Sequence, residues 1–191
     1  MDHAIGIRLK KIDDTYTPLS SHFFGSPKVP LEWVFSELYE TELLLCQLDL
    51  AALAAFDPSV ELPHTGYLYV LLQMRDGSPY PDVRILHTTD TPDYLALDFN
   101  AEAEGYEHLN EPWAVEFYPV APDAPCTRLL GDYTLNPFKR DHPRLFLQLD
   151  LPALNAAGVD FLPDKNAFLC IYLGEDDAPF ENLDARFLEK K

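Results

Sequence analysis

Two strings in the sequence carry the same polar side chains at the same spacing: LLCQLDLAAL and, further along, LFLQLDLPAL. A glutamine precedes an aspartate by two positions in each, as Gln47 and Asp49 and again as Gln148 and Asp150. Because residues two apart on a strand share a face, these pairs are candidates for lining a ligand cleft between two halves of the chain. The alternative is structural: the aspartates cap short helices and the glutamines bond neighbouring backbone. The structural interpretation is favoured.

Acidic side chains gather in one interval, because no lysine or arginine occurs between Arg84 and Arg128. Within it, the segment NAEAEGYEHLNEPW places aromatic rings among carboxylates, a mixture that suits an interface where rings anchor and acids steer a basic partner. The alternative is a solvated acidic loop, since charge runs usually face water. The residues predicted to contact a partner are Asp90, Asp93, Glu102, Glu104, Tyr106, Glu107, Glu111 and Trp113.

The histidines and cysteines show none of the spacings that mark a metal site or an activated nucleophile. No two of the six histidines stand three or four residues apart, and the chain lacks GxSxG, P-loop, GxGxxG and HExxH motifs. Cys46, Cys126 and Cys170 are far apart and form no CxxC pair, which predicts reduced thiols. We therefore predict no catalytic residue, no metal and no cofactor, and favour a protein that is not an enzyme.

Composition narrows the classes of partner. The 191 residues include 32 acids and 14 bases, giving a formal net charge of −18. This charge repels nucleic-acid phosphates and anionic lipid, so we expect no nucleic acid and no membrane, and a basic protein as partner. No apolar run approaches the roughly 20 residues of a membrane span, and the start of the chain lacks the features of a signal peptide. A cytoplasmic location is expected.

The repeated strings predict two copies of one supersecondary unit. Residues 42–48 and 144–149 are leucine-rich runs typical of buried strands. Asp49 and Asp150 then occupy the N-cap position of two predicted short helices, LAALAAF and LPALNAAG. A Leu-Pro pair and a second apolar run, YLYVLLQM or AFLCIYLG, follow in both copies. Each copy is therefore expected to be strand, short helix, strand.

The remainder of the sequence predicts further strands and one more helix. Residues 82–89, 93–100 and 113–120 carry β-branched and aromatic residues between turn signals, as strands do. Residues 30–42 place Leu31, Val34, Phe35 and Leu38 at helical spacing, and we predict a short helix there. The proline-rich stretch 119–126 has the composition of a connector.

The expected fold class is α+β, with a mostly antiparallel sheet built from two internally duplicated strand–short helix–strand units. We expect one domain over 1–191, with pseudo-repeat halves at about 22–118 and 127–187 joined by the connector 119–126. The two halves are expected to share one core, because a unit this small buries little apolar surface alone.

The order of motifs resembles the YwqG-like family, whose domain is also called DUF1963. That order is a Phe-Gly-x-Pro-x-x-Pro loop at 24–30, LLLCQLDLAAL, LPHTGYLYVLL, RLLGDY, RLFLQLDL and FENLDARF, and it covers roughly residues 22 to 187. The chain differs from the family at two places. Phe24-Gly25 stands where the family has a Gly-Gly pair, and the segment FLPDKNAF lacks the glycine that the family has there. The resemblance implies a fold more than an activity. Members of the family are scattered through bacteria, and some lie near toxin genes.

Two classes of function remain. The first is a non-catalytic acidic protein-binding module, of an immunity type that neutralises a basic toxin partner through the acidic interval. The second is a small-molecule binder or hydrolase with a cleft between the two repeat halves, lined by the two Gln-Asp pairs. We favour the first.

Overall fold

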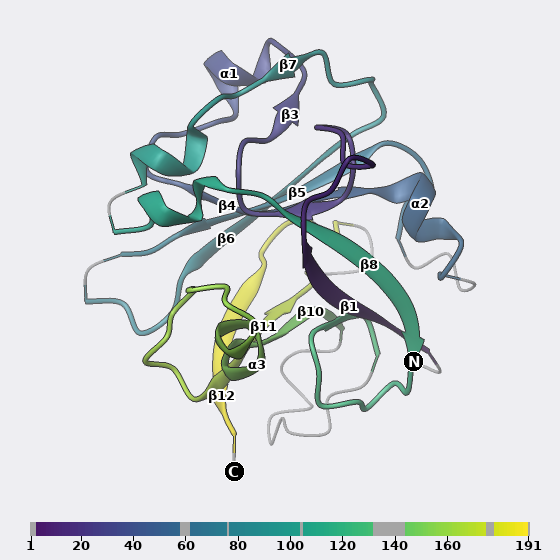
Figure 1. Ribbon diagram of the computed structural model, residues 1–191, viewed down its shortest axis with the longest axis vertical. Helices are drawn as coiled ribbons and strands as arrows, with labels where there is room; N and C mark the ends of the chain where they lie inside the picture. The colour runs from purple at the N-terminus through teal and green to yellow at the C-terminus, as the bar shows by residue number, and fades with distance from the viewer. Residues whose placement is uncertain are drawn as a thin grey trace. The chain divides into compact units, whose positions relative to one another are not determined.

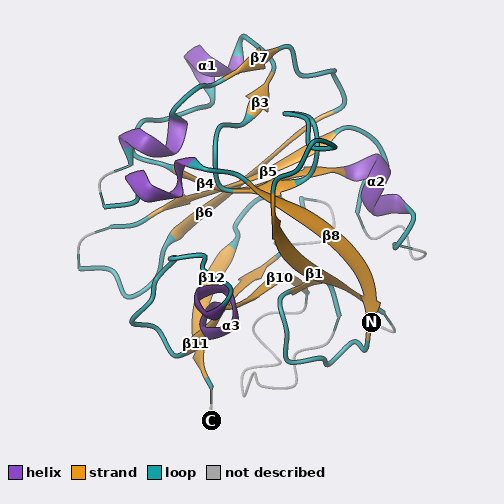
Figure 2. Ribbon diagram, in the orientation of Figure 1, coloured by secondary structure: helices purple, strands orange, loops and turns teal. Residues whose placement is uncertain are grey.

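The computed structural model is mostly antiparallel β-sheet with a few short helices (Figure 1 and Figure 2). The predicted predominance of antiparallel sheet is confirmed. The chain folds as two compact units, which we call the C-terminal and the N-terminal unit. The C-terminal unit comprises Met1–Arg8, Arg75–Arg84 and Glu116–Lys191, and the N-terminal unit comprises Leu9–Met74 and Ile85–Val115. The structure describes residues 3–57, 62–75, 77–103, 105–131, 144–174 and 178–190.

The N-terminal unit is built around two long antiparallel strands, β4 (Leu43–Asp49) and β5 (Tyr67–Gln73). Both are continuous apolar runs, and nearly every residue of each is buried, as such runs predict. α2 (Leu50–Ala54) begins directly where β4 ends. The two-residue strand β2 (His22–Phe23) pairs on one side with β4 and on the other with β8 (Trp113–Val120).

Further elements complete this unit. β6 (Asp82–Thr88), whose residues 85–88 belong to the unit, is the neighbour of β5 in the sheet. A separate two-stranded sheet pairs β3 (Lys28–Val29) with β7 (Tyr94–Leu95). α1 (Trp33–Ser36) follows β3 and lies beside β7 in Figure 1. These elements bring residues 28–36 against residues 93–98, although the two stretches are far apart in the sequence.

The C-terminal unit repeats the same local plan. A long buried strand runs directly into a short helix, and a second buried strand returns antiparallel beside the first. The strand order of this unit is β12-β11-β10-β9-β1. Its elements are β9 (Arg128–Leu129), β10 (Leu145–Asp150), α3 (Leu151–Ala156), β11 (Ala167–Tyr172), β12 (Asp184–Glu189) and residues 4–8 of β1 (Ala4–Lys11).

The helices end after one or two turns. α3 carries Pro152 in its first turn, where a missing N–H costs little, and it ends before Gly158, whose φ of 91° suits a glycine just past a helix. Within the described part of the chain, no helix is long and apolar enough to cross a membrane.

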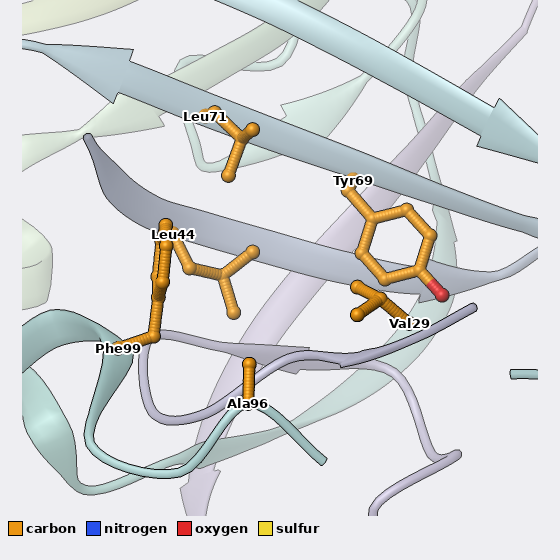
Figure 3. Close-up of a cluster of buried hydrophobic side chains, with 6 residues drawn as sticks. All are labelled: Val29, Leu44, Tyr69, Leu71, Ala96 and Phe99. Carbon is orange, nitrogen blue, oxygen red and sulfur yellow. The ribbon is translucent and has the colours of Figure 1, made fainter. Parts of the chain in front are cut away.

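A buried apolar cluster joins the two sheets of the N-terminal unit (Figure 3). Trp33 packs edge-on against the Tyr69 ring, with centroids 5.5 Å apart, and so attaches α1 to β5. The Tyr69 hydroxyl donates a hydrogen bond of 2.6 Å to the Lys28 carbonyl, which attaches β3 to the same strand. The cluster consists of Val29, Leu44, Tyr69, Leu71, Ala96 and Phe99.

Each unit contains a pair of consecutive residues with left-handed backbone. Phe24 and Gly25 have φ of 58° and 74°, and Leu130 and Gly131 have φ of 58° and 91°. Phe24 N–H donates to the Leu45 carbonyl at 3.0 Å, and Leu130 N–H donates to the Phe146 carbonyl at 2.9 Å. A Cβ at Gly25 would lie 2.9 Å from Pro112 Cβ, and one at Gly131 only 2.8 Å from Ala4 Cβ. Glycine is therefore required in both pairs by conformation and by space.

The strand predicted over 93–100 is wrong for most of its length. Only Tyr94–Leu95 is extended and paired, as β7, and a 3₁₀ helix occupies Phe99–Glu102. Asp98 precedes that helix with a left-handed φ of 57°, which turns the chain. The turn allows Ala96 and Phe99 to enter the same buried cluster, a tertiary constraint that local propensity does not contain.

The short helix predicted within 30–42 is confirmed as α1, but it forms a single turn. Val34 and Leu38 pack against the buried cluster, as expected from their spacing. Leu31 and Phe35 do not: their exposed fractions are 46% and 85%. α1 contains only Val34 and Phe35 of these four residues, and Val34 alone of the two packs against the cluster.

Candidate functional site

The first Gln-Asp pair of the sequence is held by backbone groups of the N-terminal unit. Asp49 Oδ1 accepts hydrogen bonds from the amides of Ala51 at 3.0 Å and Ala52 at 3.4 Å, so it caps α2. Gln47 is fully buried. Its Oε1 accepts from the Lys28 amide at 2.8 Å, and its Nε2 donates to the Pro18 carbonyl at 2.9 Å.

The second pair has the same arrangement in the C-terminal unit. Asp150 Oδ1 accepts from the Ala153 amide at 3.1 Å and caps α3. Gln148 Nε2 donates to the Cys126 carbonyl at 2.9 Å. The predicted helix caps are therefore confirmed, and both glutamines clamp the loop that precedes the neighbouring short strand. Each of these four side chains makes at least one hydrogen bond to the protein's own backbone.

Two buried bases lie opposite the glutamines and were missed from the sequence. His22 is paired with Gln47 across β2 and β4, and Arg128 is paired with Gln148 across β9 and β10. Both bases are fully buried. Burial lowers the pKa of His22 to about 4, and a ring nitrogen of His22 lies 2.8 Å from the Ser20 carbonyl oxygen. The signal in the sequence was positional, because each base stands three residues before a glycine, Gly25 in one unit and Gly131 in the other.

Residues 85–115 of the acidic interval belong to the N-terminal unit, and hydrogen bonds attach them to it within the described residues. Asp93 Oδ1 accepts a hydrogen bond of 3.0 Å from the Leu31 amide. Asp98 Oδ1 accepts from Asn110 Nδ2 at 2.8 Å, and the Asp98 amide donates to Ser26 Oγ at 3.0 Å. These bonds fix two turns of the segment against residues 26–31.

Asn100 is the buried anchor of this segment. Its side chain is fully buried and makes three hydrogen bonds to backbone. Oδ1 accepts from the Leu44 amide at 2.8 Å, while Nδ2 donates to the carbonyls of Leu44 and Leu109, each at 3.1 Å. An amide side chain can match both a donor and acceptors in this way. Asn100 therefore binds the acidic segment to β4.

The residues predicted to contact a partner separate into exposed and buried groups. Asp90, Asp93, Glu107 and Glu111 are exposed. Hydrogen bonds from its own amide and from that of Gly105 lower the pKa of the Glu107 carboxyl, which keeps it charged. Glu104 lies outside the described residues, and the side chain of Glu102 is likewise not described.

The two aromatic residues of that prediction are less accessible than the acids. Tyr106 is half-buried, and burial raises the pKa of its hydroxyl. Trp113 is only 7% exposed, and Lys11 Nζ lies 3.7 Å from the centre of its ring. A ring covered in this way has little surface to offer a partner. The anchoring role predicted for Trp113 therefore needs a different set of apolar residues.

The cysteines have the environment of packing residues. Cys46, Cys126 and Cys170 are free thiols, as expected. Burial raises the pKa of all three, that of Cys170 to about 12, so the thiolate nucleophile is disfavoured. Among the described residues, no group of three or more His, Cys, Asp or Glu side chains is placed to hold a metal ion.

Comparisons with known proteins give no match: no protein-family model, no curated protein and no solved structure is similar to the chain.

Proposed function

We propose that this protein is a non-catalytic, acidic protein-binding module that presents residues 90–111 of its N-terminal unit to a basic protein. The proposal is carried by one observation: the acidic side chains of this segment are exposed, while its backbone is held in place by hydrogen bonds. Asp90, Asp93, Glu107 and Glu111 are exposed, while the segment that bears them is fixed to β4 by the buried Asn100.

Order in the acidic segment favours specific binding over general attraction. A partner that meets fixed carboxylates does not have to bear the entropy of ordering a loop. The net charge of −18 adds long-range attraction for a basic protein, which speeds association and is screened by salt. The two effects together describe a binder with fast, salt-sensitive association.

We propose further that the chain arose by internal duplication and is a divergent member of the YwqG-like family. The duplication is supported by matched local geometry in the two units. In each, an aspartate caps the helix, a glutamine clamps a loop, and a hydroxyl bonds the aspartate amide. Ser21 Oγ accepts from Asp49 N–H at 2.9 Å, and Thr127 Oγ1 accepts from Asp150 N–H at 3.0 Å. The proximity of some family members to toxin genes supports an immunity-type role against a basic toxin.

The proposal is tested by affinity capture with a charge-neutralised variant. The triple variant Asp90→Asn, Glu107→Gln, Glu111→Gln removes three exposed charges from the segment. A matched control, Asp164→Asn, Glu181→Gln, Glu189→Gln, removes three exposed charges from the C-terminal unit. In affinity capture at low salt, the wild type and the control variant should each bind one basic protein. The triple variant should not bind it. Recovery of no basic protein, or equal capture by both variants, refutes the proposal.

A further inference from the structure

We infer that exposed apolar side chains of α1, β7 and the residues next to them in the chain form a docking surface for a cationic amphipathic segment of a partner protein. We call this the α1–β7 surface; it consists of Leu31, Phe35, Tyr94 and Leu97. The inference rests on the proposed function, because it assigns the apolar anchors to the same basic partner. It also replaces Trp113 as the anchor, since that ring is buried.

Hydrogen bonds within the N-terminal unit bring the two stretches together. The Leu31 amide is bonded to Asp93, the residue before Tyr94. Val29 and Tyr94 are partners in the β3–β7 ladder, and the Ala96 amide donates to the Pro27 carbonyl at 2.9 Å. α1 and β7 lie next to each other in Figure 1 and Figure 2. The surface is therefore a property of the fold and not of one loop.

All four residues are exposed at the surface of the N-terminal unit. Phe35 is 85% exposed and Leu97 is 72% exposed, although their neighbours Val34 and Ala96 are packed on the buried cluster. Leu31 and Tyr94 are 46% and 41% exposed. Exposed large apolar side chains on two stretches that the fold brings together are a feature of interaction sites, whereas single exposed apolar residues are common.

The charges beside the surface define its occupant. Lys28 is the sole base in residues 26–40 and 90–99, and those stretches hold six acids. The acids are Glu32, Glu37, Glu40, Asp90, Asp93 and Asp98. Apolar anchors among carboxylates complement a segment with apolar residues on one face and Lys or Arg around them, as in helix-in-groove recognition. A second copy of this acidic chain and an anionic membrane are both repelled.

The test uses two synthetic probes that differ in one property. The first is a helical peptide of about 18 residues with one leucine face and one lysine face; the second has serine in place of every leucine. Wild-type protein should bind the Leu/Lys peptide at least about tenfold tighter than the Ser/Lys peptide, measured by calorimetry. In the variant Phe35→Ser, Leu97→Ser this preference should fall to about twofold or less, with binding of the Ser/Lys peptide unchanged.

Two controls separate this inference from the proposed function. Ile12→Ser, Tyr80→Ser changes two other exposed apolar residues and should retain the tenfold preference. The triple charge variant of the acidic segment should weaken both peptides by the same factor. If the preference for the Leu/Lys peptide survives Phe35→Ser, Leu97→Ser, the docking surface is refuted while the proposed function stands. If the charge variant binds both peptides as wild type does, the proposed function fails instead.

Alternative occupants give distinct results. Sedimentation as a dimer that Phe35→Ser, Leu97→Ser dissociates would identify a second copy as the occupant and overturn the inference. Binding to phosphatidylcholine vesicles that the same variant abolishes would identify a lipid surface and overturn it as well. A wild type that sediments as a monomer and ignores such vesicles, with the preference for the Leu/Lys peptide intact, supports it.

Discussion

Asp150 and Lys190 form a two-pronged ion pair within the C-terminal unit. Lys190 Nζ lies 2.8 Å from Asp150 Oδ1 and 2.7 Å from Oδ2, and the Asp150 side chain is only 6% exposed. Asp49 occupies the corresponding place in the N-terminal unit and caps its helix, but no described residue forms an ion pair with it. The lysine therefore adds a charge partner to one of two otherwise similar helix caps.

Replacing Lys190 by methionine should lower the free energy of unfolding by about 1–2 kcal/mol. The change leaves a nearly buried carboxylate with its cap bond but without its counter-charge, and methionine keeps most of the side chain's length. Urea unfolding of Lys190→Met, Asp150→Asn and the double variant measures the coupling between the two residues. Strictly additive effects would show that the pair contributes nothing.

The helix cap at Asp49 can be tested without a counter-charge. Asp49→Ala should cost about 1 kcal/mol of stability, because it leaves first-turn amides of α2 without an acceptor. Asp49→Asn keeps the accepting oxygen and should cost only a few tenths of that amount. Asp150→Ala should cost more than Asp49→Ala, since it removes a cap and an ion pair together. Equal losses for Asp49→Ala and Asp49→Asn would show that charge, not capping, matters at this position.

Asn100→Ala should be the most damaging single change in the acidic segment. It leaves one amide and two carbonyls buried without their side-chain partner, at a cost of about 3 kcal/mol. The Leu44 amide should also exchange its hydrogen faster, which hydrogen-exchange NMR measures residue by residue. Asn110→Ala is the control, because Asn110 bonds the exposed Asp98 and its loss should cost under about 1 kcal/mol. Similar losses for the two variants would contradict the anchoring role of Asn100.

The sequence predicted those elements whose signal is local. The leucine-rich runs became β4 and β10, the runs that follow became β5 and β11, and residues 113–120 became β8 with the predicted bounds. Strands of this kind bury both faces, so an unbroken apolar run identifies them without knowledge of their neighbours. The aspartate caps were also local, since a cap bonds amides within three residues of itself.

The elements and residue roles that the sequence did not predict depend on contacts with residues distant in the sequence. The strand β2 is two residues long and exists because β4 and β8 lie on either side of it. The roles of Asn100 and His22 likewise follow from what the fold brings to them. The exposure of Phe35 could not be deduced from helical spacing, because the spacing shows which residues share a face but not whether that face is covered.

The buried His22 should make stability depend on pH below neutrality. Burial lowers the pKa of His22 from the ordinary 6.5 to about 4 in the folded protein. Between these values the unfolded chain binds a proton that the folded chain does not, so stability falls as pH decreases from about 6.5 to 4 and the loss is complete below that range. A shift of this size corresponds to about 3 kcal/mol.

The variant His22→Gln isolates this contribution from that of the carboxylates. Glutamine does not titrate, so the free energy of unfolding of His22→Gln should fall less steeply with decreasing pH than that of the wild type, by up to about 3 kcal/mol across this range. His108→Gln is the matched control, because it replaces an exposed histidine of the same unit by the same residue. NMR titration of the His22 ring in the wild type gives an independent readout. A His22 ring that titrates near pH 6.5 in the folded protein would contradict the prediction, whatever the stability of the variant.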